Sequence, residues 1–215
     1  MSCPRSQRGN VLIYILIAIV LFGALIFAVS SSIRGGMDTG EQEKSRLAAG
    51  ALMEYSDQAK VAVQRMKLDG TPTASLSFLR PGEAGYTTAP HTAKVFHPEG
   101  GGLPYKTNWQ DLDDSSAPTS TAVVAIVRNV VQGVGSTAED IVFSVSHIGS
   151  DACSRLQQTV RGTSTAYAIS AAFSPVFETG ATDLDNAVCA SCVGVQAACV
   201  VNGGVYTFYR VIDVN

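Results

Sequence analysis

The chain has 215 residues, of which 46% are hydrophobic and only 15% are charged, and its formal net charge is -3. Without an excess of basic residues the chain has no electrostatic basis for binding the phosphate backbone of nucleic acid, so no nucleic-acid partner is predicted. The length allows one ordinary globular domain outside the apolar N-terminal segment.

The most apolar stretch runs from Asn10 to Val29 and follows a basic nine-residue leader that ends at Gly9. A helix of about 20 apolar residues can cross the hydrocarbon core of a bilayer, so this stretch is predicted to be a membrane helix. Two arginines precede the stretch and acidic residues follow it, which places the N-terminus in the cytoplasm. The run is too long for an ordinary secretory signal, although the small residues Ser30 to Ser32 leave cleavage there open.

A second helical pattern follows the apolar stretch. Gly35-Gly36 is predicted to loosen the helix, and Asp38 or Thr39 can cap a restart. From Glu41 to Leu68 apolar residues recur every three or four positions, which indicates an amphipathic helix that must dock on another element. The predicted buried stripe consists of Leu47, Ala51, Leu52, Tyr55, Ala59, Ala62, Val63 and Met66, and the charged residues Glu43, Lys44, Arg46, Asp57, Lys60, Arg65 and Lys67 fill much of the opposite face. The helix is predicted to end at the sequence Asp69-Gly70-Thr71-Pro72.

The rest of the chain is predicted to form a small sheet after a turn-rich connection from Thr71 to Pro104. Strand composition and turn signals predict strands over 121–131, 140–146 and 205–214, with a hairpin loop over 133–136. A further strand is predicted from Tyr167 to Phe177, although Pro175 restricts it. A short helix is predicted from Ser150 to Val160, with Ser150 as its cap and Gly162 as its stop.

Four of the five cysteines, Cys153, Cys189, Cys192 and Cys199, lie on the predicted outer side of the membrane, whereas Cys3 is in the leader. An even number of cysteines in an oxidising compartment predicts two disulfides, and three pairings are possible. A bond from Cys153 to one of the three C-terminal cysteines is favoured, because it closes a loop of about 40 residues and constrains the unfolded chain most. Among these three we favour Cys199. This choice leaves Cys189 with Cys192.

None of the remaining motifs predicts catalysis, a metal or a cofactor. The run from Gly100 to Thr107 is superficially like a phosphate-binding loop, but Pro104 and Tyr105 break the pattern and a surface turn is predicted. Cys189 and Cys192 have redox-motif spacing without the required strand and helix context, so a structural disulfide is favoured. The three histidines lack the spacing of a zinc site, and two acidic groups are interpreted as solvated turns: His91, His97 and His147, then Asp111, Asp113 and Asp114, and Asp183, Asp185 and Asn186. The chain is therefore predicted not to be an enzyme.

The basic leader ending in glycine, the apolar helix and its amphipathic extension together resemble the class III signal of type IV pilins and pseudopilins. The segment from Ile141 to Gln157 is similar to the strand and cysteine-bearing helix of type IVb pilins. The resemblance implies that a prepilin peptidase cuts after Gly9 and methylates Asn10. Two positions differ from the family pattern: Asn10 replaces Phe, Met or Leu, and Tyr14 replaces the glutamate that in the family pairs with a neighbouring terminal amine. Some minor pseudopilins that sit at a tip also lack this glutamate.

These observations give an α+β fold class: a long N-terminal helix, with a membrane half and an amphipathic half, packed on a small antiparallel sheet in a pilin-like arrangement with disulfides. The predicted segments are a leader (1–9), a transmembrane or filament-core helix (10–34), its amphipathic continuation (35–69) and an extracytoplasmic domain (70–215). The resemblance implies a structural subunit of a type IV pilus-like or type II secretion-like filament. Its partners would be prepilin peptidase, self or other pilin-like subunits, and a membrane assembly platform. The subunit would lie in the inner membrane before assembly and in an extracytoplasmic or cell-surface filament afterwards. The alternative is a single-pass anchored protein whose outer domain binds a ligand or acts on its own.

Overall fold

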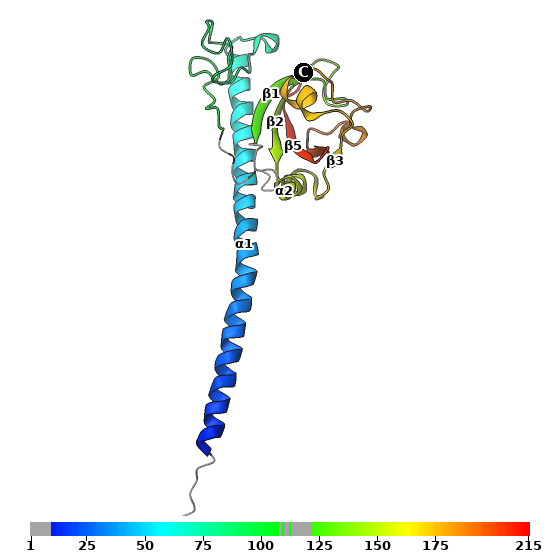
Figure 1. Cartoon of the computed structure of the whole chain (residues 1–215). Coiled ribbons are helices and arrows are strands. Elements are labelled where there is room, and N and C mark those ends of the chain that lie inside the picture. Colours follow the sequence, from blue (N-terminus) through cyan, green and yellow to red (C-terminus); the bar gives the residue numbers. More distant parts are fainter. Residues whose placement is uncertain (1–9, 108, 110–111, 113–121) are drawn as a thin grey trace, which may run out of the picture. The chain divides into compact units, whose positions relative to one another are not determined.

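The computed structural model of the protein describes residues 10–107, 109, 112 and 122–215; the side chains of residues 10–12 and 27–42 are not described. The elements, in chain order, are α1 (Asn10–Leu68), a short 3-10 helix (Thr73–Ser75), β1 (Val123–Asn129), β2 (Asp140–Ile148), α2 (Ser150–Arg161), β3 (Tyr167–Ala168), a π-helical turn (Ser174–Glu178), a second 3-10 helix (Ala190–Cys192), β4 (Ala197–Asn202) and β5 (Val205–Asp213) (Figure 1). The chain divides into two compact units, Met1–Lys44 and Ser45–Asn215, and α1 contributes to both.

The backbone of α1 is helical throughout, including Gly35 and Gly36. The predicted loosening and restart at this point are therefore wrong. Each glycine costs a helix only about 1 kcal/mol relative to alanine, and propagation from the formed turns on both sides offsets such a cost. The helix ends at Leu68, as predicted, and Gly70 follows with a φ of 93°.

The fold is α+β with a small mixed sheet. The strand order is β1-β2-β5-β4-β3, and every neighbouring pair is antiparallel except β3 and β4, which are parallel. The predicted purely antiparallel sheet is thus corrected by one short pair, Tyr167 with Val200 and Ala168 with Val201. A parallel pair needs a long connection, and the chain from β3 to β4 supplies one in the form of the π-helical turn and the second 3-10 helix.

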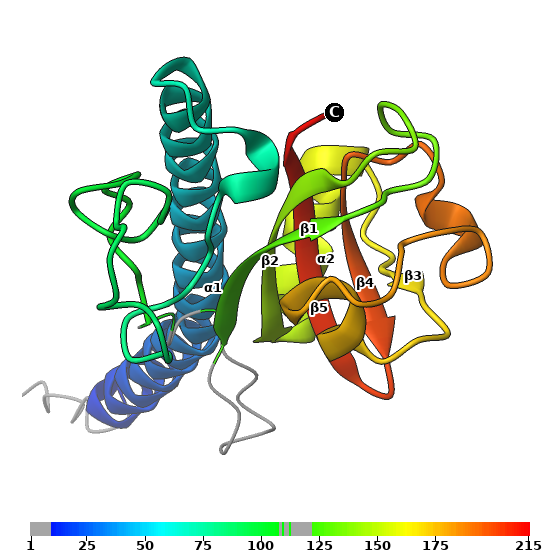
Figure 2. The same ribbon diagram turned by 90° about the horizontal axis from the view of Figure 1, so that it is seen from above.

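The second unit has two hydrophobic cores, one on each face of the sheet. Figure 2 shows the ribbon of the sheet and the segments beside it. Residues alternate between the two faces along each strand: in β2, Phe143 joins the core beneath α1 and α2, whereas Val142 joins the opposite core. The opposite core is covered by the chain between β3 and β4, which contributes Val176, Phe177 and Leu184.

The amphipathic part of α1 packs on the first of these cores. Of the predicted stripe, Leu52, Tyr55, Ala59, Ala62, Val63 and Met66 are buried and Ala51 is partly buried. Leu47 is 66% exposed, which corrects its prediction, because the packed stripe begins only at Ala49. Ser56 is buried although it is polar, because its hydroxyl accepts a 2.7 Å hydrogen bond from Arg210 of β5.

Several residues of the predicted charged face of α1 contact other parts of the domain. Arg210 forms a 2.8 Å ion pair with Asp57, and Lys67 forms a 2.5 Å ion pair with Asp213. The Arg65 guanidinium donates to the carbonyls of Gly100 and Gly101. These contacts connect α1 to β5 and to the loop that contains Gly100 and Gly101, so several charges on α1 have structural roles.

The strands predicted over 140–146 and 205–214 correspond to β2 and β5, and the strand predicted over 121–131 corresponds to β1, although residue 121 lies outside the described residues. Two predictions are corrected. The strand expected from Tyr167 to Phe177 stops at Ala168, and Pro175, which has no N–H for a ladder, lies in the π-helical turn. β4 was not predicted, although it forms a hairpin with β5 through the two-residue turn Gly203-Gly204.

The helix predicted after β2 is α2. Its residue Gly162 has a left-handed conformation with a φ of 74° and ends the helix as expected. The predicted cap at Ser150 is displaced by one residue: Gly149 occupies the N-cap position, and no side chain caps the helix there.

Candidate functional site

The predicted processing site lies at the boundary of the described residues. Gly9 lies outside them, and Asn10 is the first residue of α1, with its side chain also outside the description. Cleavage after Gly9 and methylation of Asn10 therefore remain predictions.

The first unit presents an apolar helix surface. All side chains from Ile13 to Ile26 are exposed, and the large hydrophobic residues among them are 50% to 69% exposed. Tyr14 is 66% exposed. Apolar surface of this extent on every side of a helix requires a covering partner.

Among the residues searched, which are only the described ones, no helix combines the length and the apolar character needed to cross a membrane.

Four cysteines form two disulfides in the pairing that the sequence analysis favours, Cys153 with Cys199 and Cys189 with Cys192. The first joins α2 to β4 with 46 residues of separation and a Cα–Cα distance of 5.6 Å. The second spans three residues at the second 3-10 helix. All four sulfurs belong to buried residues, so both bonds lie within the packing of the domain.

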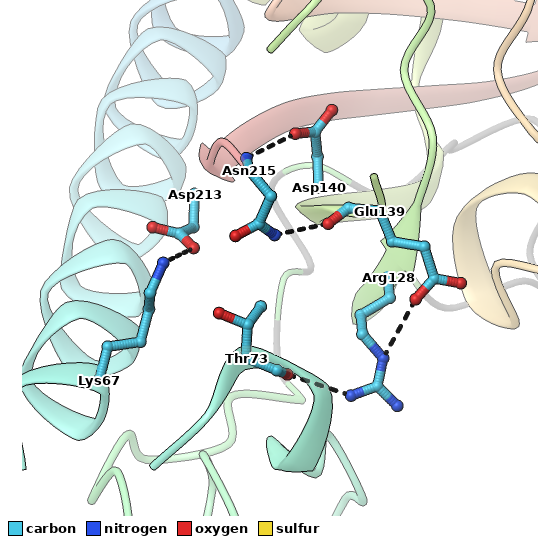
Figure 3. Close-up of polar contacts among 7 residues, drawn as sticks. All are labelled: Lys67, Thr73, Arg128, Glu139, Asp140, Asp213 and Asn215. Atoms are coloured by element: carbon cyan, nitrogen blue, oxygen red, sulfur yellow. Dashed lines mark hydrogen bonds and ion pairs between the residues drawn. The ribbon is translucent and has the colours of Figure 1, made fainter. Parts of the chain in front are cut away.

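A polar cluster surrounds Asn215, the last residue of the sequence (Figure 3). The Asn215 backbone N–H donates to the Asp140 carboxylate at 3.1 Å, and its side-chain amide donates to the Glu139 carbonyl at 2.5 Å. Arg128 forms a 3.6 Å ion pair with Glu139 and donates to the Thr73 carbonyl. These contacts join β5, the start of β2, β1 and the loop after α1.

Asp140 is the one chemically unusual member of this cluster. Burial raises the pKa of its carboxyl group above the ordinary 3.8, against backbone hydrogen bonds from Asn215 and Val131, and the nearby Asp213 carboxylate raises the pKa further. One of its carboxyl oxygens, Oδ2, has no partner among the described residues. Asp140 is therefore a buried carboxyl group with one oxygen that no described residue satisfies.

The motifs set aside in the sequence analysis have structural roles. In the run from Gly100 to Thr107, the N–H groups of Gly101 and Gly102 donate to the carbonyls of Lys94 and His97, which leaves no cradle of free donors for a phosphate. The rings of His91 and His97 stack 4.1 Å apart, and no group of three metal-ligating side chains occurs among the described residues.

Of the two acidic groups, only the one around Asp185 lies within the described residues. Asp185 uses its carboxylate locally, because that group accepts hydrogen bonds from the backbone of Ala187 and Val188 at 2.9 Å. Asp111, Asp113 and Asp114 lie outside the described residues.

The burial of Lys94 was missed from the sequence, whereas that of Tyr55 was predicted as part of the stripe of α1. Lys94 is 5% exposed, and its ammonium group donates to the carbonyls of Gly85, Tyr86 and Thr88. Tyr55 donates to the Pro104 carbonyl at 2.8 Å, and burial raises its pKa to about 12. A lysine in a turn-rich segment carries no sequence signal for burial, whereas the position of Tyr55 within the helical stripe does.

In comparisons with known proteins, no family model, no curated protein and no solved structure matches the chain.

Proposed function

We propose that the chain is a structural subunit of a type IV pilus-like or type II secretion-like filament: a pilin, minor pilin or pseudopilin. A prepilin peptidase cuts it after Gly9 and methylates Asn10, and the subunit then assembles through its N-terminal helix. It enters the inner membrane with a cytoplasmic N-terminus and ends in an extracytoplasmic or cell-surface filament.

One observation carries the proposal: the side chains from Ile13 to Ile26 are apolar or small, and all are exposed. Lipid and a bundle of identical helices are both apolar surroundings that cover such a surface. The helix therefore moves from the membrane to a filament without exposing its side chains to water. The disulfide-linked α+β unit that follows is suited to the oxidising side of the membrane.

Tyr14 gives the proposed assembly a particular character. An unpaired carboxylate at this position would be costly in an apolar core, and a paired one would fix the register between neighbouring subunits. A tyrosine avoids the cost of burying a charge, but it also removes this ion pair. Register between subunits then comes from the globular unit or from a hydrogen bond of the Tyr14 hydroxyl. These features favour a minor subunit over an abundant one.

The test is the substitution Gly9→Val in cells that contain a prepilin peptidase, read by intact mass and N-terminal sequencing. The unaltered chain is expected to begin at Asn10 with one added methyl group, and the variant to keep its leader. Gly23→Val is the matched control, since a Cβ at Gly23 meets nothing within 4 Å, and this variant is expected to be processed normally. Processing of Gly9→Val, or an unaltered chain that keeps its leader, would disprove the proposal.

A further inference from the structure

A groove runs along the outer edge of β1, the strand at one end of the sheet. It has a volume of about 580 Å³. Two runs of consecutive residues line it, Ala125 to Arg128 of β1 and Ala74 to Arg80 of the loop after α1. Successive side chains of an extended chain point to opposite faces, so side chains alone would place only every second residue in the lining. Because the lining residues are consecutive, the backbone edges of the two segments form the walls. We call this site the β1 groove.

The backbone of Ile126 faces the groove. The Val124 carbonyl accepts a 3.3 Å hydrogen bond from Tyr105, and the Val130 carbonyl accepts a 2.9 Å hydrogen bond from Leu184, so both point away from β2. The direction of the backbone groups alternates along an antiparallel strand, which turns the N–H and C=O of Ile126 outward as well. Neither group has a hydrogen-bond partner among the described residues.

The opposite wall presents a second free edge. Ser77 exchanges hydrogen bonds with Ala93 and Val95 at 2.8 Å and 2.9 Å, so its backbone faces away from the groove. Phe78, the next residue of this extended chain, therefore directs its N–H and C=O into the groove. These groups also lack partners among the described residues.

The gap between the two edges is short enough for one side chain to cross. The single side chain of Arg128 crosses it, and its guanidinium donates to the carbonyls of Ala74 and Leu76 at 2.9 Å and 3.0 Å. A strand inserted between two others needs twice the interstrand spacing of about 4.8 Å, which agrees with a gap that one arginine spans. Beyond Arg128 the edge is already covered, because Gly180 packs directly on the Arg128 carbonyl.

The charges at the groove favour a basic occupant. Arg80 forms a 2.6 Å ion pair with Glu83, and Arg128 forms a 3.6 Å ion pair with Glu139, whose side chain is 58% exposed. The third carboxylate of the lining, Glu178, accepts a hydrogen bond from the Ser146 hydroxyl and has no basic partner among the described residues. The groove therefore has an excess of one negative charge.

We infer that the β1 groove binds an extended peptide segment that carries a lysine or arginine. The peptide adds as a sixth strand, with backbone hydrogen bonds to Ile126 on one side and Phe78 on the other, and with its cation beside Glu139 and Glu178. This inference does not rest on the proposed function, because it uses only contacts within the second unit.

The test uses the full chain in detergent micelles and residue-resolved amide hydrogen exchange by NMR. The probe is the blocked pentapeptide Thr-Val-Lys-Val-Thr, and the control peptide has the same sequence with a methyl group on the central backbone nitrogens. The Lys peptide is expected to slow exchange at Ile126 and Phe78 by about tenfold or more, as new backbone hydrogen bonds do. The methylated peptide is expected to leave both rates unchanged.

Charge reversal provides the second arm. In the double variant Glu139→Lys, Glu178→Lys, the affinity for the Lys peptide is expected to fall by up to about fivefold for each exposed ion pair that is lost. The Glu peptide, which has glutamate in place of the central lysine, is expected to bind this variant better than the Lys peptide does. Glu54→Lys, on the exposed face of α1 away from the groove, is the matched control and should not change the preference.

Four results would overturn the inference. The first is that the Ile126 amide exchanges slowly even in the free chain, and the second is that no peptide protects it at millimolar concentration. The third is that a peptide protects amides elsewhere in the domain instead. The fourth is that protection increases with protein concentration when no peptide is present. The last result would identify a second copy of the chain as the occupant in place of a free peptide.

Discussion

One buried ammonium group organises the turn-rich loop between α1 and the sheet. Lys94 places its charge among three backbone carbonyls, those of Gly85, Tyr86 and Thr88, where water cannot replace it. Removing a charged donor from buried acceptors leaves those acceptors unsatisfied, which is more costly than losing an exposed hydrogen bond.

We therefore expect Lys94→Met to lower the free energy of unfolding by about 3 kcal/mol, measured by urea denaturation. Lys60→Met, on the partly exposed surface of α1, is the control and should change it by about 0.5 kcal/mol or less. An equal effect of the two substitutions would show that the carbonyl cage contributes nothing beyond the loss of a lysine.

A second single residue makes stability depend on pH. Because burial raises the pKa of Asp140, the unfolded chain releases this proton first as the pH rises above 3.8. The folded chain then binds more protons than the unfolded chain, so stability falls with rising pH until the folded pKa is passed. Below pH 3.8 both states are protonated and the penalty is absent.

Asp140→Asn cannot ionise, so its stability relative to the unaltered chain should increase as the pH rises from about 3 to 7. Urea denaturation at a series of pH values measures this difference. Asp183→Asn, at an exposed position, shows the effect of removing one surface charge. A difference for Asp140→Asn that stays constant or decreases with pH would contradict the burial of an ionising carboxylate.

At the scale of elements, the two disulfides differ in what they constrain. Cys153 and Cys199 are 46 residues apart, and Cys189 and Cys192 are three residues apart, while all four are 0% or 1% exposed. Loop-closure entropy gives a loss of about 4 kcal/mol on removing the first bond and about 2 kcal/mol on removing the second.

The paired alanine variants of each bridge are matched controls for one another, because each removes two buried sulfurs. We expect the Cys153→Ala, Cys199→Ala variant to unfold at a clearly lower urea concentration than the Cys189→Ala, Cys192→Ala variant. The reverse order would mean that the short bridge holds the core of the C-terminal segment more strongly than chain entropy accounts for.

The elements that the sequence predicts correctly are those with local signals. α2 has a left-handed Gly162 at its end, and β2 and β5 are runs of β-branched and aromatic residues between turn residues. β4 was missed because its six residues, Ala197 to Asn202, begin with two alanines and follow the Cys189 to Cys192 turn closely. The glycine pair after Asn202 was a usable hairpin signal, since a two-residue turn requires a strand on each side.

At the scale of the whole molecule, loop length favours a bond from Cys153 to the C-terminal cysteines, but the order of the strands in the sheet does not follow from local sequence. The position of β5 between β2 and β4, and the parallel pair of β3 and β4, depend on which strands meet after the intervening chain has folded. The β1 groove could not be predicted from the sequence either, because it is formed by the backbone edges of two segments that lie far apart in the chain. Motif searches detect side chains, and neither Ile126 nor Phe78 carries a motif.

The division of the chain at Lys44 and Ser45 leads to a final prediction. Both hydrophobic cores and both disulfides lie within Ser45–Asn215, and the packed stripe of α1 begins at Ala49. A fragment that starts at Ser45 keeps all of these contacts and loses the exposed apolar residues from Ile13 to Ile26.

We expect the Ser45–Asn215 fragment to be a monomer in aqueous buffer and to unfold cooperatively in urea, at nearly the same midpoint as the full chain in detergent. A shorter fragment that starts at Asp57 lacks Ala49, Leu52 and Tyr55, and should be less stable by at least about 3 kcal/mol, the cost of removing one large buried side chain. Aggregation or gradual unfolding of the longer fragment would show that the first unit also stabilises the second. Equal stability of the two fragments would show that the helix stripe between Ala49 and Tyr55 contributes nothing to the core that it covers.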